Sequence, residues 1–166
     1  MPLVELPNDS FETNTTGWAS NGAGVTIERV ADGTAPDGSF SLKVNVGGGG
    51  WEGIGGVRSN SVDVAAGGTH SYELMAKVPI GRTIFPAISE RNSGDSQLAF
   101  KENVVGIAGT GEWMKVGHEA TFGGSGVKLR AFLRVDGAGA AAFWVDSVAE
   151  GGIVVPRRLL LLGVGR

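Results

Sequence analysis

Three side chains on one stretch of the sequence alternate in a way that suits ligand binding. Arg130, Phe132 and Arg134 occupy every second position between Lys128 and Val135. Successive side chains of a strand point to opposite faces of its sheet, so these three share one face. An aromatic ring flanked by two arginines on an open sheet face suits a sugar platform or a protein contact. The pattern predicts a ligand-binding surface, on which replacement of Phe132 by Ala would spare folding.

The tryptophans are the other candidates for ligand contact. Trp51 stands in a glycine-rich segment, GGGGWEGIGG, where no core position is evident, so we expect it to contact either a ligand or a partner. Trp18 and Trp113 are expected in the core. Trp144 follows Phe143 directly, so only one of the two can face outward on a strand.

The inventory of catalytic groups is poor. The chain has no cysteine, which excludes thiolate nucleophiles and thiolate metal sites. Its two histidines, His70 and His118, lie on separate predicted strands without acidic partners, and we expect both to be polar residues of strand surfaces. No nucleophile-elbow, zinc or phosphate-loop pattern is present. None of the 17 acidic residues forms a recognisable catalytic pair. We therefore expect no enzymatic activity.

The elements that must position these residues are short strands, because apolar residues recur with a period of two. Glycine-rich and Asp-Gly turns separate the segments, and no helical period is evident. The sequence therefore predicts an all-β fold, an antiparallel sandwich of the jelly-roll type. The expected strands are Leu3–Leu6, Val25–Val30, Phe40–Val46, Val57–Val64, Tyr72–Val78, Thr83–Ser89, Leu98–Val105, Trp113–Phe122, Lys128–Val135, Ala141–Ala149 and Ile153–Val155.

Length and charge limit the class of protein. A chain of 166 residues is one domain of ordinary size that can bury a core without disulfides. The net charge is −3, and the last ten residues carry three arginines and no acid, so residues 1–156 stand at −6. An acidic body argues against nucleic-acid binding. The start, MPLVELPNDS, does not resemble a secretory signal, and the longest apolar run is too short for membrane insertion.

Five motifs in order resemble the carbohydrate-binding modules of families four, nine and twenty-two, whose fold is a galactose-binding-like jelly roll. The resemblance covers Leu3 to Glu150. The motifs are NDSFETNTTGW at Asn8–Trp18, GSFSLKV at Gly38–Val44, GGTHSY at Gly67–Tyr72, GTGEW at Gly109–Trp113 and FWVDSV at Phe143–Val148.

The resemblance implies a structural calcium ion. In these modules the Glu of the first motif and the Asp of the last strand commonly hold calcium, with backbone carbonyls of the GS-SL turn. Carried over to this sequence, the ligands are Glu12, Asp146 and the backbone of Ser39 to Lys43, centred on Ser41. The alternative is that both carboxylates only accept backbone N–H bonds.

The tail beyond the last motif suggests how the module is used. Residues 1–155 form the predicted sandwich, and residues 156–166 join a four-leucine run to three arginines. Such a tail suits docking on a partner, because interfaces favour apolar side chains and arginine. We expect a virion surface protein, a phage head decoration or minor tail protein, with bacterial surface glycan as its target. The alternative is a polysaccharide-binding module of a secreted glycoside hydrolase, found outside the cell.

Overall fold

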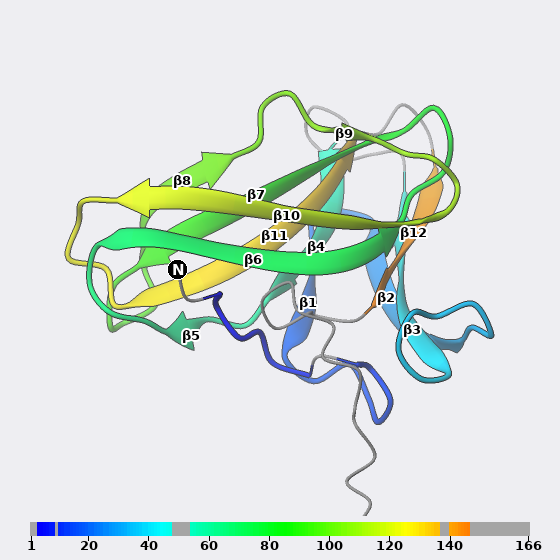
Figure 1. Cartoon of the computed structure of the whole chain (residues 1–166), viewed down its shortest axis with the longest axis horizontal. Helices are drawn as coiled ribbons and strands as arrows, with labels where there is room; N and C mark the ends of the chain where they lie inside the picture. Colours follow the sequence, from blue (N-terminus) through cyan, green and yellow to red (C-terminus); the bar gives the residue numbers. More distant parts are fainter. Residues whose placement is uncertain (1–2, 9, 48–53, 137–139, 147–166) are drawn as a thin grey trace, which may run out of the picture.

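The computed structural model describes residues 3–8, 10–47, 54–136 and 140–146, which form an antiparallel β-sandwich (Figure 1). This part of the chain contains strands and no helix, so it offers no helical span for a membrane. The strands are β1 (Trp18–Asn21), β2 (Val25–Ala31), β3 (Phe40–Val46), β4 (Ile54–Ser59), β5 (Val62–Asp63), β6 (Gly68–Lys77), β7 (Thr83–Arg91), β8 (Gln97–Glu102), β9 (Ile107–Ala108), β10 (Trp113–Phe122), β11 (Lys128–Asp136) and β12 (Ala141–Asp146).

Two sheets make up the sandwich. Sheet I has the order β1-β4-β11-β7-β8, with β5 beside β11 and β9 beside β7. Sheet II has the order β10-β6-β12-β3-β2. The last described strand, β12, therefore lies between β3 and β6, and the first residues reach the other end of β6 through a parallel bridge between Leu3 and Ser71. Both ends of the described chain are thus tied to sheet II.

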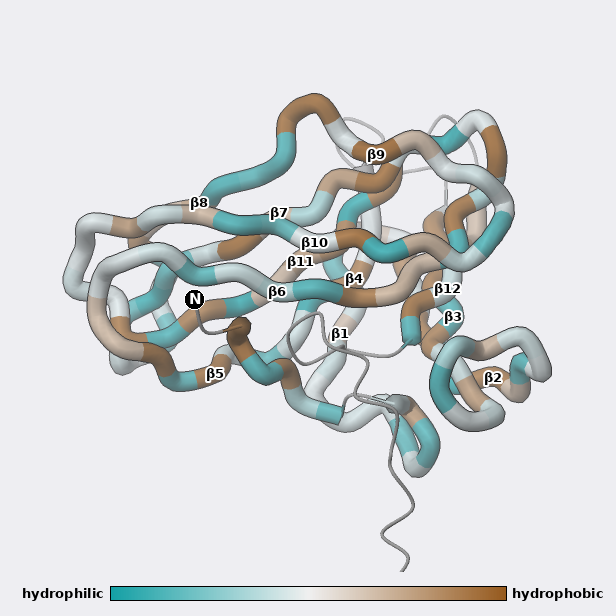
Figure 2. The backbone as a smooth tube through the Cα atoms, in the orientation of Figure 1, coloured by the Kyte–Doolittle hydropathy of each residue, from teal (hydrophilic) through white to brown (hydrophobic). Residues whose placement is uncertain are grey.

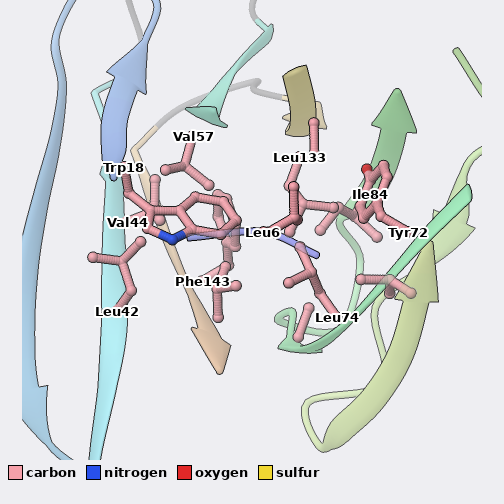
Figure 3. Packing of buried hydrophobic residues seen from close by; sticks show 14 of the residues in the cluster. Leu6, Trp18, Leu42, Val44, Val57, Tyr72, Leu74, Ile84, Leu133 and Phe143 are labelled. Carbon is pink, nitrogen blue, oxygen red and sulfur yellow. The ribbon is translucent and has the colours of Figure 1, made fainter. Parts of the chain in front are cut away.

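The core fills the space between the sheets, because each strand turns every second side chain inward. Figure 2 shows the hydrophobic and hydrophilic residues interspersed along β6 and β10. In Figure 3, Trp18 from sheet I lies beside Leu42 and Phe143 from sheet II, and Leu133 of sheet I belongs to the same core. Phe143 and Leu133 are fully buried, and Trp18 is 6% exposed. Burial of this apolar surface is the main stabilising contribution to the fold.

A tyrosine hydroxyl links the two sheets inside the core. Tyr72 of β6 donates a hydrogen bond of 2.6 Å to the carbonyl of Phe132 and accepts one of 3.2 Å from the amide of Ala87. Phe132 and Ala87 face each other on β11 and β7. The hydroxyl therefore stands between these two backbone groups, and burial raises the pKa of Tyr72, which keeps it protonated.

The sandwich predicted from the period of two is confirmed, and two predicted strands have the observed bounds, Phe40–Val46 and Trp113–Phe122. The strand predicted at Val57–Val64 is divided in two, β4 and β5, because the strand is interrupted at Asn60 and Ser61. The strand predicted at Leu98–Val105 ends at Glu102, since a turn at Asn103 follows.

Two other differences lie near the chain start. The strand predicted at Leu3–Leu6 is only the bridge to Ser71, and the four-residue strand Trp18–Asn21 was not predicted, because it is too short to show a period. Three predictions fall outside the described residues: Trp51, the strand at Ile153–Val155 and the tail of residues 156–166.

Candidate functional site

Strand β11 places the predicted ligand residues on the outer face of sheet I. Its odd-numbered residues, Leu129, Ala131, Leu133 and Val135, belong to the core. Arg130, Phe132 and Arg134 therefore point away from the second sheet, as the alternation requires. We call this surface the arginine face; its members are Arg58, Phe85, Arg91, Asp95, Phe100, Glu102, Arg130, Phe132 and Arg134.

Pairing of β11 with its neighbours surrounds Phe132 closely. Arg58 of β4 lies directly opposite it on one side, and Ala87 of β7 on the other. The ring of Phe100, from β8, packs edge-on against Phe132 with centroids 5.4 Å apart. The guanidinium of Arg134 lies 5.9 Å from the centre of the Phe100 ring.

Phe132 is only 7% exposed as a result. The face of the strand is as predicted, but an open aromatic platform at Phe132 is wrong, because Phe100 and the neighbouring side chains cover the ring. Phe132 therefore supports the surface from below. Phe100 and Phe85, which lies opposite Arg134, are the half-buried aromatics beside the arginines.

Glycine is needed where β4 approaches β11. Gly56 pairs with Arg134, and a Cβ at this position would overlap the carbonyl of Leu133. The close approach sets the register that brings Arg58 opposite Phe132. A glycine-rich segment without any evident pattern in the sequence thus positions one arginine of the site.

Asp95 organises one end of the arginine face. It lies in the turn between β7 and β8 and accepts hydrogen bonds from Arg91 at 2.8 Å and from Arg130 at 2.6 Å. The Ser61 hydroxyl also bonds to it. The Ser61 hydrogen bond and the charges of Arg130 and Arg91 hold the pKa of Asp95 below its usual range.

The other end of the face has a second ion pair. Arg134 lies 2.9 Å from Glu102 of β8, and both side chains are largely covered. Arg58, by contrast, makes no hydrogen bond or ion pair with any described residue, although it is half-buried. Burial, with the nearby charges of Arg91 and Arg58, lowers the pKa of Arg130. Arg58 and Arg91 therefore act on Arg130 as like charges.

The predicted calcium ligands converge on one turn in the structure. Glu12 Oε1 accepts N–H bonds from Ser39 at 2.9 Å and Phe40 at 3.0 Å, and Asp146 Oδ2 accepts one from Asp37 at 2.9 Å. Glu12 and Asp146 lie 134 positions apart in sequence yet hold the same turn. Both carboxylates thus accept backbone N–H bonds, which is the arrangement expected if they hold the turn without a calcium ion.

Further features of this turn bear on the metal. Ser41 is fully buried, and its hydroxyl lies 3.5 Å from Asp32. Gly38 has a φ of 79°, and a Cβ there would overlap the Glu12 carboxylate. Within the described ranges, no three His, Cys, Asp or Glu side chains gather as a metal site.

The tryptophan predictions divide. Trp18 lies in the core as expected, and of the adjacent pair Phe143 is buried while Trp144 faces outward. The prediction of a core position for Trp113 is wrong. Met114 packs inward beside Val116, so Trp113 stands on the outer face of sheet II, where its Nε1 lies 3.2 Å from the Thr34 hydroxyl.

Strand pairing forms a row on that outer face which the sequence did not reveal. Lys77 lies opposite both Trp113 and Trp144, and Lys43 lies opposite both Trp144 and Glu28. Five strands far apart in the sequence contribute one residue each. No local signal could have found this row, because it depends on which strands pair.

The histidines do not form a catalytic group with each other. His70 is buried, with its Nε2 2.9 Å from the carbonyl of Gly67, so its predicted surface position is wrong. His118 is half-buried, and burial lowers its pKa. Each is accounted for by its strand position on sheet II.

Comparison with solved structures finds the same fold in other proteins. Tailspike protein 4 of bacteriophage CBA120 has a TM-score of 0.67 and 16% identity, over 92% of this chain and 21% of that one. The xylan-binding CBM22-1 domain of Paenibacillus barcinonensis Xyn10C has a TM-score of 0.59 and 21% identity, over 84% of this chain and 88% of that one. The C-terminal family 22 module of Clostridium thermocellum Xyn10B has a TM-score of 0.60 and 15% identity, over 88% and 94%.

The chain therefore spans about a fifth of the tailspike domain but nearly the whole of the two xylanase modules. No curated protein matches it significantly. The family model described as a carbohydrate binding domain, of module families four and nine, matches residues 6–136, most of the described sandwich. The chain belongs to this family of carbohydrate-binding domains.

Proposed function

We propose that the chain is a non-catalytic module that binds polysaccharide through the arginine face. The observation that carries the proposal is the crowding of polar side chains on one sheet face that the core does not use. Arg58 and Arg134 offer N–H donors to sugar hydroxyls, while Arg91 and Arg130 are largely covered and contribute mainly positive charge. Phe100 and Phe85 add apolar contact for a ring. Asp95 and Glu102 hold three of these arginines in place, so less conformational entropy is lost on binding.

Affinity electrophoresis of the whole chain through gels that contain soluble polysaccharides tests this function. Retardation in at least one gel, abolished by Phe100→Ala together with Arg134→Gln, is the expected result. The matched control is Lys115→Gln, which alters an exposed residue of sheet II. Retardation that survives the double change would place binding elsewhere and contradict the role of the arginine face.

We further propose that the protein is located on the surface of a phage virion, as a head decoration or minor tail protein. The likeness in fold to the tailspike of a bacteriophage supports it, together with the apolar and basic residues 156–166, which suit docking on other virion subunits. The two xylanase modules favour a second candidate, a polysaccharide-binding module of a secreted glycoside hydrolase.

Co-assembly separates the two settings. A chain that ends at Val155 should fold, yet should be absent by mass spectrometry from purified particles that contain the full chain. A full chain that never copurifies with particles would favour the secreted-enzyme setting. Unfolding of the shortened chain would show that the tail packs on its own sandwich.

Calcium binding at the turn held by Glu12 and Asp146 is a separate part of the proposal. Glu12 and Asp146 bring carboxylate oxygens to the Asp37–Phe40 turn, close to the buried Ser41, and calcium prefers oxygen ligands of this kind. The ion would stabilise the turn rather than take part in sugar binding. Thermal melting in the presence of a chelator tests this part.

A further inference from the structure

Positive charge is concentrated on the arginine face. The described part of the chain holds six arginines, and four of them stand there: Arg58, Arg91, Arg130 and Arg134. Arg29 and Arg82, the other two, donate to backbone carbonyls elsewhere. The whole chain carries a net charge of −3, so this face departs from the average of the molecule.

Carboxylates on the face neutralise only part of this charge. Asp95 forms ion pairs with both Arg91 and Arg130, and Glu102 forms one with Arg134. Two acids therefore stand among four guanidinium groups. At one end of the same face Lys128 lies opposite Asp63. At the other end Asp136, whose carboxylate accepts the amide of Thr83, adds one further acid two residues beyond Arg134.

Arg58 is the one arginine of the arginine face that forms no ion pair with a described residue. It lies opposite Phe132, and Arg130 and Arg134 follow at the diagonal positions of the adjacent strand. Diagonal neighbours in an antiparallel pair are about 7–8 Å apart, within reach of long side chains. The outer face of sheet II has no such surplus among its described residues. Lys43 pairs with Glu28, Lys115 pairs with Glu73, and the charge of Lys77 acts on Asp32.

Aromatic stacking on this face is limited to half-buried phenylalanines. Phe132 is covered, Phe100 and Phe85 are half-buried, and no Trp or Tyr of the described residues lies there. A neutral sugar would gain little from ring stacking here. Guanidinium groups instead match carboxylate, sulfate and phosphate oxygens through two parallel hydrogen bonds, which are stronger than those to neutral oxygens.

We propose that the arginine face recognises an anionic polysaccharide, and that the acid group of one sugar unit binds Arg58 between Arg130 and Arg134. The inference rests on the proposed polysaccharide-binding function and adds the class of ligand. Carboxylate and sulfate groups share the required chemistry, and the experiment distinguishes them.

Calorimetric titration of the whole chain with matched saccharide pairs tests the inference. Oligogalacturonate is compared with its fully methyl-esterified form, and dextran sulfate with dextran. Xylohexaose, which is bound in the structure of the Clostridium thermocellum Xyn10B CBM22-1-GH10 modules, serves as the neutral ligand. We expect one anionic member to bind at least about tenfold more tightly than its neutral partner, the factor that one charge-assisted hydrogen bond supplies. The charged member that binds identifies carboxylate or sulfate. Its affinity should fall as sodium chloride is raised.

Substitutions locate the effect. Arg58→Gln should remove about tenfold of the affinity for the anionic member. Arg58→Lys keeps the charge but loses the two-pronged geometry, so its affinity should lie between those of the Arg58→Gln variant and the wild-type protein. Lys115→Gln, which removes the same charge from the other sheet, should change nothing. The Arg58→Lys variant keeps the test decisive if Arg58→Gln fails to fold.

The outcomes separate this inference from the function beneath it. Binding of xylohexaose without binding of either anionic saccharide would overturn the anionic ligand and leave the polysaccharide function standing. Binding of none of the saccharides would remove support from both. Equal affinity for a DNA duplex, or full affinity in both Arg58 variants, would overturn the specific recognition proposed here.

Discussion

The Tyr72 hydroxyl donates a hydrogen bond of 2.6 Å to the carbonyl of Phe132, 60 residues further along the chain. The bond crosses from sheet II to the strand that carries the arginine face. The inner end of the site is therefore fixed to the core, at the residue whose side chain supports the outer surface. This relationship couples the stability of the sandwich to the geometry of the site.

Replacement of Tyr72 by Phe should lower the free energy of unfolding by about 1–3 kcal/mol, because it leaves the Phe132 carbonyl and the Ala87 amide without their buried partner. Urea denaturation measures the change. Thr26→Val, which removes an exposed hydroxyl from β2, should stay within about 0.5 kcal/mol. An equally small effect at Tyr72 would show that the two backbone groups bond each other directly.

Replacement of Phe132 by Ala should cost stability, in contrast to the prediction from the sequence. The ring is 7% exposed and packs on Phe100, so we expect a loss of about 3 kcal/mol, the lower end for a buried Phe. Thermal and urea unfolding measure it. Phe100→Ala removes the other partner of the contact and should cost less, because Phe100 is only half-buried. Wild-type stability in the Phe132 variant would mean that the ring is not covered in solution.

Asp95 should make the free energy of unfolding fall as the pH is lowered. Its pKa is lowered in the folded state, so its contribution is present above the unfolded value, near 3.8, and is lost as pH falls through the folded value. We expect Asp95→Asn to be less stable than the wild-type protein at pH 7 and to show a shallower loss of stability below pH about 4. Chemical denaturation at several pH values compares the slopes. Parallel curves for the two proteins would contradict the ion pairs with Arg91 and Arg130.

Removal of calcium should lower the melting temperature if Glu12 and Asp146 hold the ion. An ion at 100 times its dissociation constant stabilises the native state by about 2.7 kcal/mol. Melting with a chelator, and then with calcium restored, measures the effect. Asp146→Asn should abolish the response to the chelator, whereas Glu28→Gln, which alters an acid of β2, should keep it. An identical melting temperature with and without chelator would leave only the N–H bonds to the turn.

Local alternation accounts for what could be predicted. Leu42, Val44 and Val46 are buried every second residue, and β11 divides in the same way, so the strands and the face of Arg130 and Arg134 could be read from the sequence. Alternation does not predict which side chains of other strands cover a residue on the outer face. The covering of Phe132 depends on Phe100, 32 positions earlier, which only the pairing of β7 with β8 brings near.

Arg58 and Asp95 could not be predicted for the same reason, because their place in the site depends on strand pairing. Arg58 enters through the register of β4 with β11, and Asp95 through the turn that carries it to Arg130. Neither lies near the other in sequence, and no motif marks them. Trp113 was misplaced because an aromatic beside a glycine turn fits either face of a strand, and the inward position of Met114 decides which.

Strand β11 serves two purposes through alternate residues, and this has a consequence for how such a protein diversifies. Changes at the positions of Arg130 and Arg134 alter the outer surface, while Ala131 and its odd-numbered neighbours keep the core unchanged. The ligand preference of a lineage can therefore drift while its scaffold persists. Position 132 is the exception, since its ring is nearly covered and its backbone carbonyl is bound from below. We expect that site to resist variation even where the surrounding charges are exchanged.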